Sequence, residues 1–411
     1  MYEESARLSW SVRVLLVIVL TVGGAAAGFS VAAGLRVTAP RLTPTGAPQS
    51  SAVQSPSPRS GTPSPSTPAV SDPPVTDSPV PDPPVPAPPV PAGPPVTGVG
   101  ALAGDAPEPS AALLASLLNK AFDAKALITR PGGIVLDGVT GDILYDHSSG
   151  TALVPASTAK LATAAAALTV LGPAARLTTR VLDDPAAGRV VLVGGGDPTL
   201  AAGASPDGFA AARLVDLAQA TATALKARGQ TRVTVGYDAG IFSGPAVAPG
   251  WKPVYVTEGD VAPVGGLMLD GGRVAAGADP RVPDPAGAAG QRFAGLLTAD
   301  GIQVTGRARA AVGGGAEIAS VVSPPVSALV ERMLTLSDND IAEALARHVS
   351  LKKGGAGSFA AGAAAVSAAV GAIGIPGVRL TDGSGLSTQD RVTPAALAAL
   401  LRRATDRAHP E

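Results

Sequence analysis

The spacing of apolar residues predicts regular secondary structure after residue 109. From Ser110 onward, leucines recur at helical spacing, which predicts a packing helix with Ser110 as its N-cap. Two short β-rich runs follow at 133–137 and 142–146, and the glycine-bounded connection between them predicts a hairpin. An Ala- and Leu-rich run then predicts a helix that begins at 157–160 and stops at Gly172.

The rest of the pattern predicts an α/β segment followed by a helical end. Between residues 177 and 320, β-rich runs alternate with runs at helical spacing, which is typical of an inserted α/β domain. The predicted strands are 190–193, 233–235 and 302–304, and the predicted helices are 209–228, 288–297, 326–349, 359–373 and 394–407. We therefore expect an α/β (α+β) protein in which 110–176 and 321–411 form one domain and 177–320 are inserted into it.

Residues 14–35 are uncharged and lie between Arg13 and Arg36. As a helix, these 22 residues would extend roughly 33 Å, enough to cross a bilayer. We expect a single-pass membrane anchor with a cytoplasmic tail at 1–13, because the apolar stretch exceeds an ordinary signal core. The small residues at 25–27 also suit a signal peptidase, so a cleaved signal and secretion to the cell wall stay open.

The next segment, 36–109, is rich in proline. Between Pro40 and Pro95 lie 20 of the chain's 40 prolines, mixed with Ser, Thr, Val and Asp. Proline fixes φ and removes backbone donors, so this composition predicts a disordered, semi-rigid polyproline II stalk rather than a core. We expect it to act as a spacer between the membrane and the folded part.

Composition and charge exclude several classes of function. The net charge is −1, and the seven lysines form no basic run, so we expect no nucleic-acid partner. The absence of cysteine excludes disulfides and thiol nucleophiles. The three histidines, His147, His348 and His409, are scattered, and we interpret the first two as surface residues. A Ser-His-Asp triad and a zinc site are therefore poorly supported, and we expect no metal or cofactor.

A serine activated by a lysine remains as candidate chemistry. In the run Ser157-Thr158-Ala159-Lys160, the first and last positions lie on one helical face, so the ammonium can fold back toward the hydroxyl. The helix N-terminus offers backbone N–H groups to an oxyanion. Lys160 must be neutral to act as a base, and burial would lower its pKa. The pattern predicts Ser157 as nucleophile and Lys160 as its base.

A second short motif supports this interpretation. Ser-x-x-Lys alone is a weak signal, and 350–353 match it too, although two glycines end the helix there. Ser337-Asp338-Asn339 is stronger, because the chain has two asparagines and a chance match is expected roughly 0.1 to 0.2 times. These residues could also cap a helix. In acyl transfer, Ser337 would pass a proton to the leaving amine, and Asn339 would hold the substrate amide.

These motifs resemble those of the low-molecular-mass class C penicillin-binding proteins, the D-alanyl-D-alanine carboxypeptidase/endopeptidase family. The runs that carry the resemblance are 157–160, 193–200, 337–339 and 382–387, in this order. The resemblance covers about 111–407 and implies the serine β-lactamase/DD-peptidase fold, an antiparallel sheet flanked by helices with a large α/β insertion between the first two motifs. It also implies attack by Ser157 on the D-Ala-D-Ala bond of peptidoglycan stem peptides, an acyl-enzyme, and β-lactams as covalent inhibitors.

The sequence departs from the family pattern near its end. The family's third motif, Lys-Thr-Gly, does not occur, and only 26 residues follow Gly385. We therefore expect a C-terminally truncated form of an enzyme, or a gene model that is cut short. In the family, the strand that carries Lys-Thr-Gly provides an oxyanion donor, and loss of one such donor typically costs ~2.7 to 4 kcal/mol of transition-state stabilisation, so we expect impaired activity. The alternatives are a pseudoenzyme that binds stem peptide without turnover, and a β-lactamase or esterase on the same fold. Asp382 and Ser384 would shape a loop beside the site or form a plain turn.

Overall fold

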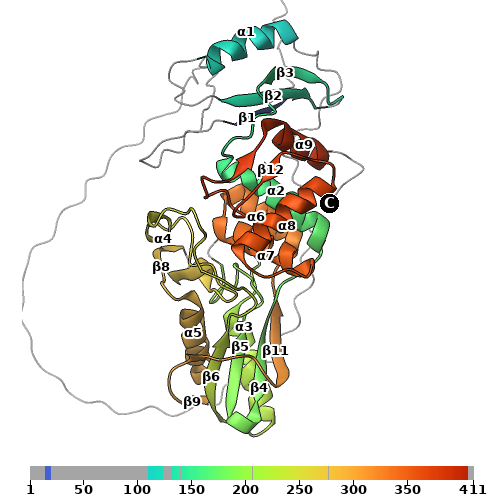
Figure 1. Cartoon of the computed structure of the whole chain (residues 1–411). Helices are drawn as coiled ribbons and strands as arrows, with labels where there is room; N and C mark the ends of the chain where they lie inside the picture. Colours follow the sequence, from blue (N-terminus) through green and yellow to red (C-terminus); the bar gives the residue numbers. More distant parts are fainter. Residues whose placement is uncertain are drawn as a thin grey trace, which may run out of the picture. The chain divides into compact units, whose positions relative to one another are not determined.

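The computed structural model describes residues 14–19, 110–123, 131–138, 140–205, 207–275 and 277–405 (Figure 1). The expected tail at 1–13, the stalk at 36–109 and most of the expected anchor lie outside these ranges. Among the described helices, none combines the length and the apolarity needed to cross a membrane. The anchor therefore stays a prediction, as do the domain bounds at 177 and 320.

A small antiparallel sheet opens the described part of the chain. Strands β2 (Gly132–Asp137) and β3 (Ile143–His147) form the predicted hairpin, and β1 (Val14–Val19) pairs antiparallel with the other edge of β2. Six residues expected to be helical are therefore extended, which suits their β-branched and leucine composition. Helix α1 (Ala111–Phe122) follows Ser110 as predicted, although the serine side chain makes no capping hydrogen bond.

The main hydrophobic core is helical. It is built from α2 (Lys160–Leu171), α6 (Val326–Leu336), α7 (Asn339–Lys352), α8 (Phe359–Ala372) and α9 (Pro394–Thr405). The two-residue strands β12 (Val378–Arg379) and β13 (Arg391–Val392) pair beside it. Helix α7 is central, since every residue from Asp340 to Ser350 is buried. Its buried positions include charged side chains, which must find partners inside the protein.

The single helix predicted over 326–349 is wrong, because the structure divides it into α6 and α7. Ser337 adopts the left-handed conformation, with φ 55°, and ends α6. Asp338 then caps α7 by accepting a hydrogen bond from the Ile341 N–H at 2.9 Å. The cap is therefore Asp338, and neither Ser337 nor Asn339. The break places the Ser337–Asn339 motif at the junction of two helices.

The segment between α2 and α6 contains a mixed six-stranded sheet. Its strands are β4 (Thr178–Asp184), β5 (Arg189–Val193), β6 (Arg232–Asp238), β9 (Gln303–Val304), β10 (Arg309–Ala310) and β11 (Ala316–Val322). The order is β10-β6-β5-β4-β11, and β9 also pairs with β6. Strand β6 pairs parallel with β5 and with β10, whereas β4 pairs antiparallel with β5 and with β11. Because the first and last strands are neighbours, the chain enters and leaves this sheet side by side.

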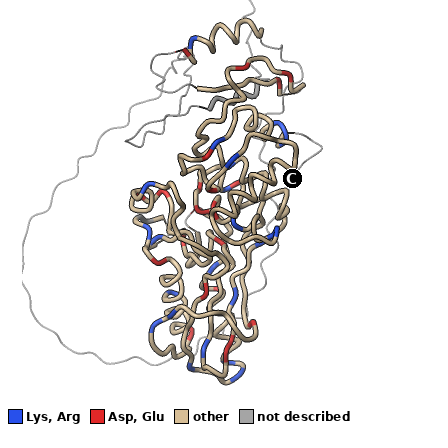
Figure 2. Tube along the Cα trace, in the orientation of Figure 1, with Lys and Arg blue, Asp and Glu red and all other residues tan. Residues whose placement is uncertain are grey.

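Two helices cover one face of this sheet. Helix α3 (Leu214–Ala227) contacts β4 and β11, and α5 (Pro285–Ala299) contacts β6, β9 and β10 (Figure 1). The alternating burial of β4 is the pattern of a strand with one covered face. The shorter elements are α4 (Val254–Thr257), β7 (Arg273–Ala275) and β8 (Ala278–Arg281). Basic and acidic positions are interspersed along the described trace (Figure 2).

Loops of the α/β segment contact α7 through its buried polar residues. Asp340 pairs with Arg281 at 2.9 Å and accepts a hydrogen bond from the Ala262 N–H at 2.8 Å. Further along, His348 Nε2 lies 3.3 Å from the Gly196 carbonyl oxygen. His348 is 9% exposed, so the prediction of a surface histidine is wrong; burial lowers its pKa to about 4. The glycine run at 194–196 forms a loop against this ring.

The Arg281–Asp340 pair should contribute to stability because both side chains are only 4% exposed. Asp340→Ala would remove the carboxylate that pairs with the buried Arg281 guanidinium, at an expected cost of ~3–5 kcal/mol in the free energy of unfolding. The matched control is Asp216→Ala in the exposed Arg213–Asp216 pair, where we expect a loss below ~1 kcal/mol. Urea unfolding followed by tryptophan fluorescence measures the free energy of unfolding of both variants. Equal losses would contradict the contribution of the buried pair to stability.

Candidate active site

Ser157 lies at the start of α2, as the sequence predicted. A 3-10 helix over Ala156–Ala159 leads directly into α2, and the Ser157 side chain is exposed. Ala156 has a φ of 48°, in the left-handed region, and the Thr158 hydroxyl donates to the Pro155 carbonyl at 2.6 Å. The turn therefore presents Ser157 to solvent while anchoring the residues on both sides of it.

The Lys160 ammonium is the centre of the site. The residue is 1% exposed, and its Nζ donates to Ser157 Oγ at 3.2 Å, to Asn339 Oδ1 at 2.6 Å and to the Ser384 carbonyl at 2.9 Å. A neutral amine has two N–H bonds and one lone pair. If the two N–H bonds go to the shorter contacts, the lone pair is left for the Ser157 hydroxyl. The geometry thus suits a lysine that accepts the proton of Ser157.

Burial prepares Lys160 for this role. Desolvation is the largest influence on its pKa and lowers it to about 8, because the charged form is disfavoured away from water. The carboxylates of Glu343, Asp338 and Asp382 oppose this effect by favouring the ammonium. A pKa near neutrality allows the amine to take up and release a proton at working pH.

Asn339 is oriented by two hydrogen bonds. Its Oδ1 accepts from Lys160, and its Nδ2 donates to the Asp260 carbonyl at 2.8 Å. Ser337 is exposed, and among the described residues its hydroxyl makes no hydrogen bond. Three of the four predicted site residues are therefore joined by hydrogen bonds, whereas Ser337 stands apart at the helix break.

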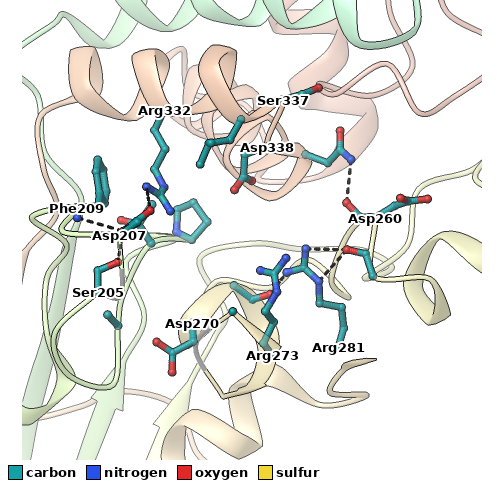
Figure 3. Close-up of a pocket in the computed structure, with 18 residues that line it drawn as sticks. Ser205, Asp207, Phe209, Asp260, Asp270, Arg273, Arg281, Arg332, Ser337 and Asp338 are labelled. Atoms are coloured by element: carbon teal, nitrogen blue, oxygen red, sulfur yellow. Dashed lines mark hydrogen bonds and ion pairs between the residues drawn. The ribbon is translucent and has the colours of Figure 1, made fainter. Parts of the chain in front are cut away.

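Ser337 and Asn339 line a cavity of about 430 Å³ between α6 and loops of the α/β segment (Figure 3). Three arginines contribute to its wall. Arg332 donates to Asp207 at 2.6 Å, and Arg281 is held by the Gly259 carbonyl as well as by Asp340. Polar groups from α6, α7 and the α/β segment thus meet beside the motif.

The loop over 381–390 is more than a plain turn. Asp382 is fully buried, and its Oδ1 accepts from the backbone N–H groups of Ser384 and Gly385, at 3.2 and 2.7 Å. Its Oδ2 accepts from the Ser387 N–H at 2.7 Å and from Trp251 Nε1 at 2.8 Å. These bonds fix the loop whose Ser384 carbonyl holds Lys160, so the expectation of a loop beside the site is the correct one.

Several residues of the site were missed in the sequence. Glu343 and Trp251 are buried and contact the 381–390 loop. Glu343 lies one helical turn after Asn339, and this spacing could have indicated that both side chains lie on the same face of the helix, beside the site. The second Ser-x-x-Lys run is a decoy as predicted: Ser350 is buried near the end of α7 and Lys353 lies exposed beyond it. Among the described residues, no group of three or more His, Asp or Glu could hold a metal ion.

Comparison with known proteins identifies the family. The model of the D-Ala-D-Ala carboxypeptidase 3 (S13) family matches residues 113–283 and 276–410. The matches cover more than half of the chain, so the protein belongs to this family, and the family expected from the motifs is confirmed.

Curated relatives agree with this membership. The chain is 37% identical over 320 residues to Carboxypeptidase Rv3627c of Mycobacterium tuberculosis, covering 75% of this chain and 67% of the relative. It is 37% identical over 325 residues to Carboxypeptidase DacB of Mycolicibacterium smegmatis, covering 76% and 68%. It is 30% identical over 383 residues to a D-alanyl-D-alanine carboxypeptidase of an Actinomadura species, covering 74% and 71%.

A solved structure supports the fold. Penicillin binding protein 4 of Haemophilus influenzae superposes with a TM-score of 0.55 at 21% identity, covering 66% of this chain and 74% of that one. The expected penicillin-binding fold, sheets flanked by helices with a large insertion, is confirmed.

Gly385 should be required by the close approach of its loop to Ala156. It has a φ of 85°, and a Cβ there would overlap the Ala156 carbonyl oxygen. Gly385→Ala should displace the Ser157 turn and slow acylation of Ser157 on the order of 100-fold. Gly374→Ala is the matched control, because its φ is 84° and open space surrounds it. The left-handed backbone should cost each variant ~1–2 kcal/mol of stability, and the overlap should cost Gly385→Ala more. Equal acylation rates in the two variants would contradict the close approach.

Lys160 should titrate far below an ordinary lysine. We expect a midpoint near pH 8, because burial disfavours its ammonium, whereas an exposed lysine titrates near ~10.4. NMR of isotope-labelled lysine side chains can resolve the seven lysines, and Lys160→Arg assigns the signal. If all signals titrate near ~10.4, the lowered pKa is wrong.

Proposed function

We propose that this protein is a serine-type D-Ala-D-Ala carboxypeptidase/endopeptidase that acts on peptidoglycan stem peptides through an acyl-enzyme. The contact that carries the proposal is the 3.2 Å approach of the buried Lys160 Nζ to the exposed Ser157 Oγ. Membership of the S13 family and relatives named carboxypeptidase support it.

In the first half-reaction, Ser157 Oγ attacks the carbonyl carbon of the D-Ala-D-Ala peptide bond. Lys160 takes the hydroxyl proton as the C–O bond forms. The peptide C–N bond then breaks, and a proton reaches the leaving D-alanine amine through the Ser337 hydroxyl. Water hydrolyses the resulting ester and regenerates Ser157. In an endopeptidase reaction, the leaving amine belongs to the cross-linking peptide.

The roles of Ser337 and Asn339 are part of the proposal. Asn339 uses both ends of its amide, toward Lys160 and the Asp260 carbonyl. To hold a substrate amide, Asn339 must therefore give up its hydrogen bond to the Asp260 carbonyl. The exposed Ser337 hydroxyl makes no hydrogen bond among the described residues and is free to relay a proton. Both residues also border the cavity of Figure 3, where the substrate's remaining atoms can lie.

The proposed site of action is outside the cytoplasmic membrane. Residues 14–35 would anchor the chain or be cleaved as a signal, and the proline-rich 36–109 would act as a spacer to the cell wall. Either role requires Val14–Val19 to leave its pairing with β2. β-Lactams, which mimic the acyl donor in this family, are the expected covalent inhibitors.

Labelling with a fluorescent penicillin tests the nucleophile. The protein should take up the label covalently, and Ser157→Ala should abolish uptake, because the ester forms on that hydroxyl. Ser350→Ala, in the second Ser-x-x-Lys run, is the control and should label like the unmodified protein. Label on the Ser157→Ala variant would show that another residue is the nucleophile.

The same samples distinguish a peptidase from a β-lactamase. The proposal requires release of D-alanine from a stem pentapeptide at a rate well above hydrolysis of a chromogenic cephalosporin. Hydrolysis of the cephalosporin without release of D-alanine would favour a β-lactamase instead.

A further inference from the structure

Glu343 is a buried carboxylate that the reaction above does not use. It lies on α7, one turn after Asn339, and is 0% exposed. Its Oε1 accepts hydrogen bonds from the backbone N–H groups of Gly383 at 3.0 Å and Ser384 at 2.8 Å, and Oε2 also lies 3.0 Å from the Gly383 nitrogen. The carboxylate therefore binds the backbone of the 381–390 loop, and a hydrogen bond with the Ser384 side chain adds to this contact.

The same backbone is held from the opposite side and by close packing. Thr163 on α2 donates its hydroxyl to the Gly383 carbonyl at 2.6 Å. A Cβ on Gly383 would lie 2.7 Å from the Ala346 Cβ and 2.8 Å from the Ala342 carbonyl oxygen, both on α7. The 383–384 backbone is thus fixed between α2 and α7, and Glu343 is its ionisable contact.

This backbone leads directly to the site. The Ser384 carbonyl accepts from Lys160 at 2.9 Å, and Ser384 is 0% exposed. We propose that Glu343 is a positioning residue: by holding the Gly383–Ser384 backbone, it places the carbonyl that fixes Lys160 against Ser157. The inference rests on the proposed function, in which Lys160 is the base.

The charge of Glu343 adds a second effect on Lys160. Burial and the neighbouring Asp382 raise the pKa of Glu343 to about 8, while its hydrogen bonds to the loop and the Arg347 guanidinium lower it. The charged groups that act on Lys160 are Glu343, Asp338 and Asp382, and all three favour the ammonium. Because the Glu343 pKa is itself about 8, this negative charge develops as the pH rises through that value, and its removal should lower the pKa of Lys160 there.

Two conservative variants separate the hydrogen bonds from the charge. In Glu343→Gln, Oε1 remains and can keep both backbone N–H bonds, but the charge is lost. In Glu343→Asp, the charge remains, but the carboxylate is one methylene shorter and withdraws from the loop. Glu331→Gln on α6 is the matched control, because Glu331 is exposed and lies outside the site.

The measurements are the Lys160 titration by NMR and the rate of fluorescent penicillin labelling as a function of pH, both on the full chain. Glu343→Gln should shift the Lys160 midpoint to lower pH, and its labelling rate above that midpoint should stay within about threefold of the unmodified protein. Glu343→Asp should label on the order of 100-fold more slowly at every pH, because the Ser384 carbonyl is misplaced. Glu331→Gln should change neither quantity.

An unchanged labelling rate in Glu343→Asp with its fold retained would overturn the positioning role, and an unchanged Lys160 midpoint in Glu343→Gln would overturn the charge effect. Thermal melts of each variant show whether the fold is retained. If Glu343→Asp unfolds, the labelling rate of Glu343→Gln above its midpoint decides, because a fall of much more than threefold would contradict positioning by hydrogen bonds alone. If the unmodified protein takes no label, the proposed function fails, and the titration of Lys160 still decides whether Glu343 acts on it.

Discussion

The buried ammonium of Lys160 is the constraint on which the site depends. An isolated cation in a protein interior is strongly disfavoured, so acceptors must surround it. Its three acceptors are Ser157, Asn339 and the Ser384 carbonyl, which come from three separate regions of the chain. The site therefore cannot assemble piecemeal: α2, α7 and the 381–390 loop must all be in place before the lysine can be buried. We therefore expect the site to form together with the helical core.

Helix α7 coordinates these regions because it is buried along most of its length. Its polar residues each meet a different neighbour: Asp340 contacts Arg281, Glu343 binds the 381–390 loop, and His348 contacts Gly196. Packing of an apolar face would allow the helix to rotate or slide by small amounts. Hydrogen bonds to three separate partners fix its rotation and register, and with them the position of Asn339 at its first turn.

Local features of the site could be predicted from the sequence, and long-range ones could not. Ser157 and Lys160 are three residues apart, so helical geometry alone brings them together, and the rarity of asparagine singled out Asn339. The burial of His348 depends on Gly196, which is 152 positions away. The break at Ser337 requires a left-handed serine, which local preference does not favour. Likewise, Val14–Val19 is extended in a sheet whose partner strand lies far along the chain.

The pairing of β4 with β11 has a consequence for how this architecture can vary. Thr178 and Val322, at the two ends of the α/β segment, are direct partners in the sheet. Seen from the helical core, the whole α/β segment is one long loop that leaves α2 and returns to α6. The pairing of β4 with β11 holds the two ends of this loop together, so extra residues within it add little to the entropy cost of closing it. We therefore expect changes of length to be tolerated at strand connections remote from α7, whereas the short stretches of the segment that touch Asp340 and His348 must keep their lengths for α7 to stay in place beside Ser157.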